Sequence, residues 1–71
     1  MQPGDLVKLV SVYGGSYHTV IVFHHPNGRT TLPEGTAAVF LGSADPTYDG
    51  NPCILVEGRV GWVWPEELEA L

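Results

Sequence analysis

The stretch that decides the fold lies near the carboxyl end and reads Glu57-Gly58-Arg59-Val60-Gly61-Trp62-Val63-Trp64-Pro65-Glu66-Glu67-Leu68-Glu69-Ala70. Gly58-Arg59 predicts a tight turn, and residues 60–64 predict a short strand that returns antiparallel to the preceding one. Pro65 cannot continue a strand ladder but suits the first position of a helical turn, whose amino end the next two glutamates favour electrostatically. Residues 68–71 then predict a short edge strand.

Upstream, apolar and β-branched runs separated by glycine and proline predict more short strands. The run Thr19-Val20-Ile21-Val22-Phe23 has the strongest strand preference, and Pro26-Asn27-Gly28 predicts a hairpin turn after it. Further alternation places Val7 and Leu9 on one face. Strands are predicted at residues 6–12, 17–24, 29–32, 36–41 and 53–57. Five or six short strands without helical periodicity predict one all-β domain over residues 1–71.

Size and composition indicate a protein that uses a partner. A 71-residue chain buries only about 60% of its unfolded surface, so its core is thin. Cys53 is the only cysteine, which excludes an internal disulfide. Charged residues make up 15% of the chain, against about 25% in typical domains, and apolar residues make up 44%. Some apolar side chains must therefore stay outside, as they do at an interface.

The charge balance disfavours a nucleic-acid partner. Lys8, Arg29 and Arg59 are the only Lys and Arg residues against eight Asp and Glu, for a net charge of −5, whereas phosphate neutralisation supplies most affinity for nucleic acid. No apolar run approaches the roughly 18 residues of a membrane span, and residues 1–5 lack the basic start of a signal peptide. We expect no membrane contact.

The order of elements resembles an SH3-like barrel: a first strand, a long hairpin-bearing loop, a second strand, a polar loop, a tight hairpin, a helical turn and a last strand. Gly58-Arg59-Val60-Gly61-Trp62-Val63, followed by Leu68-Glu69, resembles the ending of SH3 domains. Gly4-Asp5-Leu6-Val7-Lys8-Leu9 resembles the opening of many small bacterial and viral barrels. Together these motifs are similar to short SH3-like proteins encoded by tailed bacteriophages.

This resemblance implies an SH3-like barrel of five to six short antiparallel strands with one 3-10 turn before the last strand. It also implies a viral protein, in the cytoplasm of the infected host cell or associated with the virion. The groove of peptide-binding SH3 domains is at best half present. Cys53 and Ile54 stand where those domains begin a strand with tryptophan, and Trp64 and Glu67 align with the proline and tyrosine of that groove.

Histidines, cysteine and carboxylates form no pattern that predicts catalysis or metal binding. His24 and His25 would face opposite sides of a strand, His18 lies about 20 Å away along it, and no Cys or His pair has zinc spacing. We expect exposed histidines at the hairpin tip, with a pH-sensitive contact as the lesser alternative. Cys53 lacks a group that would stabilise its thiolate and is predicted to be buried and inert.

One further loop holds carboxylates without the spacing of a known site. Asp45, Asp49 and Asn51 lie together but lack the EF-hand pattern and its terminal Glu, so they are predicted to be solvated turn residues. No nucleophile and base pair or phosphate loop is visible. We predict no enzymatic activity, no metal and no cofactor.

Trp62 and Trp64 share parity, so both project from one face of their strand, with Val63 opposite. If Val63 belongs to the core, the tryptophans are at least partly exposed and mark an interface. The alternative is that both are buried against Val20 or Val22. The sequence favours neither.

The predicted function is that of a non-enzymatic protein–protein interaction module, a phage structural protein or an accessory protein that contacts the host. Its partner is another protein of phage or host, or a second copy. A nucleic-acid-binding small barrel with bases stacked on strand aromatics, and an acidic inhibitor of a host protein, are the alternatives. The residues predicted to contact the partner are Tyr13, Tyr17, Tyr48, Trp62, Trp64 and Glu67.

Overall fold

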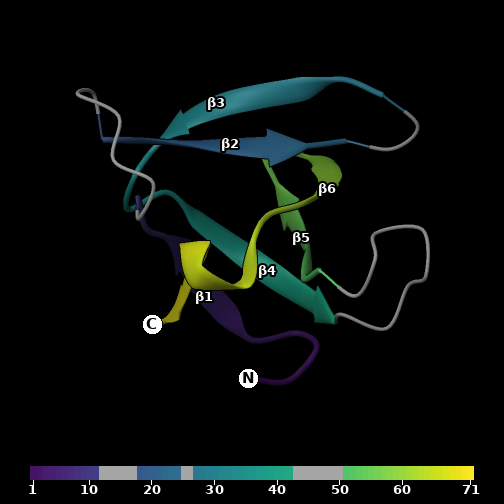
Figure 1. The fold of residues 1–71 in the computed structure, drawn as a ribbon. Helices are drawn as coiled ribbons and strands as arrows, with labels where there is room; N and C mark the ends of the chain where they lie inside the picture. Colours follow the sequence, from purple (N-terminus) through teal and green to yellow (C-terminus); the bar gives the residue numbers. More distant parts are fainter. Residues whose placement is uncertain (12–17, 25–26, 43–50) are drawn as a thin grey trace.

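A computed structural model describes residues 1–11, 18–24, 27–42 and 51–71 of the chain (Figure 1). The elements of this part of the chain follow one another as β1 (Leu6–Leu9), β2 (Thr19–Phe23), β3 (Arg29–Pro33), β4 (Ala37–Gly42), β5 (Cys53–Val56), β6 (Arg59–Trp62), the 3-10 turn η2 (Pro65–Glu67) and β7 (Leu68–Ala70). The predicted all-β class is confirmed, and so is the helical turn that begins at Pro65.

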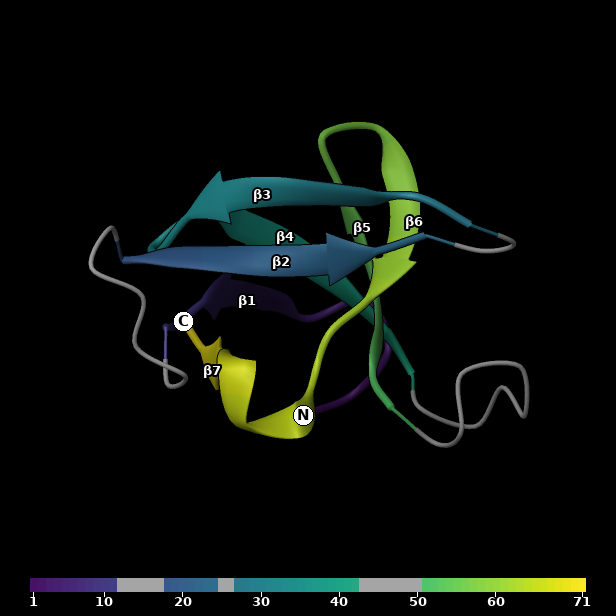
Figure 2. The ribbon, with the colours of Figure 1, turned by 45° about the horizontal axis from the view of Figure 1, so that its top comes forward.

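The seven strands form one antiparallel sheet in the order β3-β2-β6-β5-β4-β1-β7. The hairpin of β2 and β3 joins the other five strands through a single register pair, Phe23 with Trp62. Figures 1 and 2 show this hairpin lying at an angle across β4 and β1, so that one continuous sheet bends over itself and makes two layers. The bend brings the inner faces of the two layers together around the core.

The prediction of a barrel of five to six strands needs correction in two respects. The described residues contain seven strands, one at each of the seven segments predicted above, so the segments were predicted correctly and their number was too low. The sheet is also not closed, because its two outermost strands, β3 and β7, do not pair with each other.

The core follows the strand alternation. Val7 and Leu9, predicted to share a face, are both 0% exposed, as is Val63. The hairpin contributes its own inward residues to the same cluster. The complete buried apolar cluster comprises Val7, Leu9, Val20, Val22, Leu32, Ala38, Phe40, Ile54, Val56 and Val63, with Leu68 packed against it. Both layers are therefore needed to exclude water from one core.

Candidate functional site

Three aromatic side chains make a continuous cluster where the two layers of the sheet meet. The rings of Phe23 and Trp62 stack with their centroids 4.7 Å apart and their planes 23° apart. Trp64 contacts Trp62 edge to face, at 5.3 Å and 85°. We call Phe23, Trp62 and Trp64 the aromatic cluster. The stacking follows from the ladder, because Phe23 and Trp62 are directly opposite each other in the pairing of β2 with β6.

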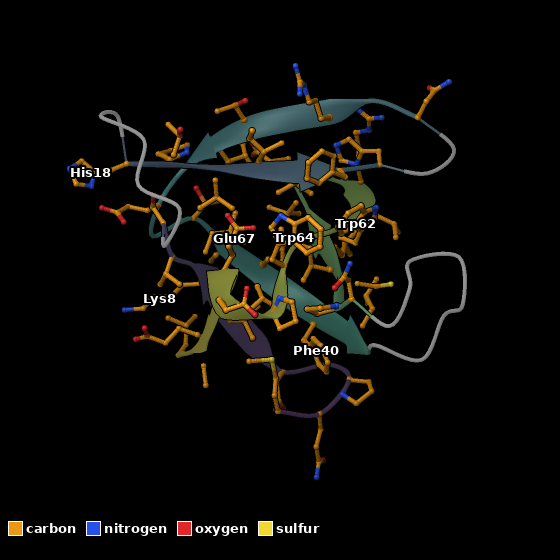
Figure 3. The ribbon with its side chains drawn as sticks, in the orientation of Figure 1. Lys8, His18, Phe40, Trp62, Trp64 and Glu67 are labelled. Carbon is orange, nitrogen blue, oxygen red and sulfur yellow. The ribbon has the colours of Figure 1, made fainter. Side chains whose placement is uncertain are left out.

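The three residues of the aromatic cluster differ in how much of each is exposed to water. Phe23 and Trp62 are half-buried, whereas Trp64 is 42% exposed although Val63 beside it is fully buried. Figure 3 shows Trp64 between Trp62 and Glu67, on the connection that leaves β6. The alternative in which both tryptophans are buried is therefore wrong, and the prediction of partial exposure is confirmed. Val20 and Val22 point into the core instead.

Two hydrogen bonds between Trp64 and Glu67 hold the exposed tryptophan in place. The Glu67 N–H donates to the Trp64 carbonyl oxygen (2.9 Å), and the Trp64 N–H donates to Glu67 Oε1 (3.3 Å). The Val10 N–H donates to the Glu67 carbonyl oxygen (2.9 Å), which ties the turn to the chain just after β1. A fixed backbone presents the indole of Trp64 with little freedom to lose on binding.

Glu67, the last residue of η2, is a buried carboxylate that is only 6% exposed. Burial raises the pKa of this carboxyl above its usual 4.5, and the negative charge of nearby Glu66 raises it further, while the hydrogen bond from the Trp64 N–H opposes both. The structure gives Glu67 a role within the chain; its contact with a partner stays a prediction.

Replacing Glu67 by glutamine is expected to stabilise the fold at neutral pH. A raised folded-state pKa means that the native protein holds this proton more tightly than the unfolded chain does. The contribution of Glu67 to the unfolding free energy is therefore fully present below pH 4.5 and is lost as pH rises through the folded-state pKa. Glutamine keeps the oxygen that accepts from Trp64 without the buried charge.

Urea unfolding of both proteins between about pH 4 and pH 8 measures this effect as a stability difference that grows with pH. Glu66→Gln is the matched control in the same turn, and we expect a smaller change of the same sign from it because the charge of Glu66 raises the pKa of Glu67 less than burial does. A difference between Glu67→Gln and the wild type that does not depend on pH would contradict the assignment.

The crossing of β2 and β6 depends on a glycine and a histidine that sequence reasoning did not single out. A Cβ on Gly61 would lie 2.5 Å from Val22 Cγ1, 2.8 Å from the Phe23 carbonyl oxygen and 3.0 Å from His24 Nδ1. His24 is 6% exposed. Its Nδ1 lies 3.0 Å from the Val60 carbonyl oxygen and its Nε2 lies 2.8 Å from the Thr30 hydroxyl. Only a glycine at position 61 lets β2 and β6 approach this closely. His24 then links β6 to β3 through its two hydrogen bonds.

The prediction of exposed histidines is therefore wrong for His24. A carbonyl oxygen can only accept, so Nδ1 carries the hydrogen that it donates to Val60, and Nε2 bonds the hydroxyl of Thr30. His24 is buried because it has the parity of Val20 and Val22, a signal already present in the sequence. His18 is exposed and lies 3.2 Å from a carboxylate oxygen of Glu34. His25 lies outside the described residues.

The structure brings together only part of the predicted contact set. The rings of Trp62 and Trp64 are in contact, and Glu67 accepts a hydrogen bond from the Trp64 N–H. Phe23 belongs to the cluster but was not predicted, although it shares parity with the outward residue Ile21. The predicted contact residues Tyr13, Tyr17 and Tyr48 lie outside the described residues.

Charged groups lie on two of the elements that carry the aromatic cluster. Arg29 lies opposite Phe23 in the β2–β3 ladder, and Glu66 is exposed on η2. Within residues 1–11, 18–24, 27–42 and 51–71, no three His, Cys, Asp or Glu side chains gather so as to hold a metal ion. Cys53 is buried at the start of β5, as predicted. The described residues include no helix that could span a membrane.

The surface that the structure offers is thus a rigidly held tryptophan on a stack of two further rings, flanked by one basic and one acidic residue. Comparison of the chain with protein-family models, with curated protein sequences and with solved structures finds no match to any of the three.

Proposed function

We propose that this protein is a non-enzymatic interaction module that binds another protein through its aromatic cluster. The observation that carries this proposal is the 42% exposure of Trp64, in a backbone fixed by Glu67, next to Trp62 and Phe23. Large aromatic anchors with restricted freedom supply most of the energy at protein interfaces. A solvated domain with a thin core gains nothing from leaving such a side chain outside.

An SH3-like topology is part of the proposal. The proposal is supported by the order of the described elements: the β2–β3 hairpin lies between β1 and β4 in the sequence, and a 3-10 turn precedes β7. The place of the proline groove is altered, since Ile54 and Cys53 are both buried and present no aromatic floor. We therefore propose a partner bound by the Trp64 side of the molecule, in a phage particle or in the infected cell.

Trp64→Ala is expected to abolish capture of the partner from the native source without loss of the fold. Because Trp64 is outside the buried cluster, its removal should leave the far-ultraviolet circular dichroism spectrum unchanged. We expect a loss of affinity of at least about 2 kcal/mol, roughly thirtyfold, as for an interface anchor. Leu41→Ala is the control, because Leu41 is 41% exposed and lies on β4, which β5 separates from β6.

The proposal fails if Trp64→Ala and Leu41→Ala retain the same captured partner to the same extent. It also fails if the bound material is nucleic acid. Fluorescence anisotropy with single-stranded oligonucleotides at about 50 mM salt tests that case, in which binding would fade as salt is added. With a net charge of −5, we expect no such binding.

A further inference from the structure

The outward face of the sheet carries a row of apolar side chains across four neighbouring strands. Leu6 on β1 pairs with Val39 on β4, Val39 with Leu55 on β5, and Leu55 with Val60 on β6. Residues directly opposite each other in an antiparallel ladder lie on the same face, so the four form one straight row, which we call the aliphatic row. Leu71, whose N–H donates to the Leu6 carbonyl oxygen (3.4 Å), follows beside it.

Three of the four residues of the aliphatic row are exposed to water. Leu6 is 59% exposed, Leu55 40% and Val60 48%, and Val39 between them is half-buried. With strands about 4.8 Å apart, the row is roughly 14 Å long. Burial of a contiguous apolar strip of this kind is favourable, and a domain with a thin core has no element left among its described residues to cover it.

We propose that the aliphatic row is the contact face between two copies of this chain, related by a two-fold axis parallel to the strands. Such an axis, passing between β4 and β5, places β1 of one copy over β6 of the other. Each leucine of the row then faces a valine: Leu6 meets Val60 of the other copy, and Val39 meets Leu55. A two-fold interface requires this kind of self-complementary order, in which residue i contacts j and j contacts i.

The charges beside the row are complementary under the same symmetry. Lys8 lies on the same face of β1 as Leu6, two residues along, and pairs with Ala37 on β4. Glu57 follows Leu55 by two residues and lies at the tip of the β5–β6 hairpin. The two-fold axis brings Lys8 of each copy next to Glu57 of the other, twice in the dimer. Lys8 already lies 3.4 Å from Glu69 but keeps 38% of its side chain exposed, and Glu57 is exposed.

A contact of four apolar side chains from each copy is small beside the 20–30 residues of a standard interface, so the dimer is weak and depends on concentration. Sedimentation equilibrium from about 10 µM to about 1 mM is the test. We expect the apparent mass to rise from 7.7 kDa toward twice that value. A wild-type protein that stays monomeric over this range overturns the proposal.

Two variants of similar exposure place the contact. Leu55→Lys puts a charge in the middle of the aliphatic row and should give a monomer at every concentration. Ile21→Lys puts the same charge on β2, outside the row, at a residue that is 37% exposed, and should dimerise as the wild type does. Both should keep the circular dichroism spectrum of the wild type. Equal dimerisation of the two variants would show that the row is not the contact.

Charge reversal tests the symmetry itself. Lys8→Glu and Glu57→Lys should each weaken dimerisation at least threefold, and the double variant should restore it, because the reversed charges again meet across the axis. The double variant still lacks the pair with Glu69, so its recovery reports only on the contact between copies. Failure of the double variant to recover rules out this two-fold arrangement.

Discussion

Gly61→Ala is expected to lower the stability of the protein by about 3 kcal/mol, the upper end of what overpacking of a closely packed site costs. In most strands alanine is at least as favourable as glycine, so the expected sign is opposite to the general trend. The reason is the approach of β2: the added methyl would lie 2.5 Å from a Val22 methyl group and 2.8 Å from the carbonyl oxygen of Phe23. The valine methyl can turn aside, but the carbonyl oxygen belongs to the strand backbone.

A loss of this size is a large part of the total unfolding free energy expected for the protein. Domains have about 0.05–0.15 kcal/mol of stability per residue, which gives roughly 4–11 kcal/mol for 71 residues. Relief of the clash would pull β6 from β2 and open the only ladder that joins the hairpin to the other five strands among the described residues. Urea unfolding followed by tryptophan fluorescence measures the change, because Trp62 and Trp64 are adjacent to the crossing.

Gly58→Ala separates crowding from backbone conformation. Gly58 has φ +75° and no atom within 4 Å of an added Cβ, so alanine there meets only the conformational penalty, about 1–2 kcal/mol. We expect the larger loss from Gly61. If Gly61→Ala is neutral or stabilising, the close crossing of β2 and β6 is wrong.

His24→Ala is expected to cost about 2–4 kcal/mol, from the cavity and from the hydrogen bonds lost at a buried site. The ring fills the space between β6 and β3, and its removal leaves the Val60 carbonyl oxygen without its 3.0 Å donor and the Thr30 hydroxyl without its 2.8 Å partner. The measurement is again the unfolding free energy in urea at fixed pH.

Two variants test whether the position of His24 matters. His18→Ala removes an imidazole that is 75% exposed, and should change stability by less than about 0.5 kcal/mol. Thr30→Val keeps the volume but removes the hydroxyl, and we expect a loss near 1 kcal/mol. Equal effects at His18 and His24 would mean that the imidazole of His24 does not hold the two strands together.

Much of the fold was predictable because strand alternation is a local signal. The parity of Val7 with Leu9, and of Val63 against its two tryptophans, placed these residues correctly. The helical turn at Pro65 was predictable because a proline excludes a ladder and begins a turn. The parity of Val20, Val22 and His24 also indicates a buried His24, whereas its place next to the hairpin turn had predicted an exposed one.

The aromatic cluster was only partly predictable, since it depends on a pairing between distant strands. Trp62 and Trp64 are close in the sequence, but Phe23 joins them only because β2 crosses β6. That crossing depends on the absence of a side chain at Gly61, and the hydrophobic pattern of the sequence does not predict which glycine allows two strands to approach closely. Closure of the sheet was beyond sequence reasoning for a related reason: it depends on whether β3 and β7 reach each other's edges, which is decided by the bend of the whole sheet.

The position of β1 between β4 and β7 has a consequence for how the chain reaches its native state. Val7 pairs with Ala70, so β1 can form its ladder with β7 only when nearly the last residues of the sequence are present. Pairings this remote give a high relative contact order, which in small β proteins goes with folding in milliseconds to seconds. During synthesis, at about 5–20 residues per second, an emerging chain would carry an unpaired β1 edge for some seconds, a period in which chaperones would have access to it.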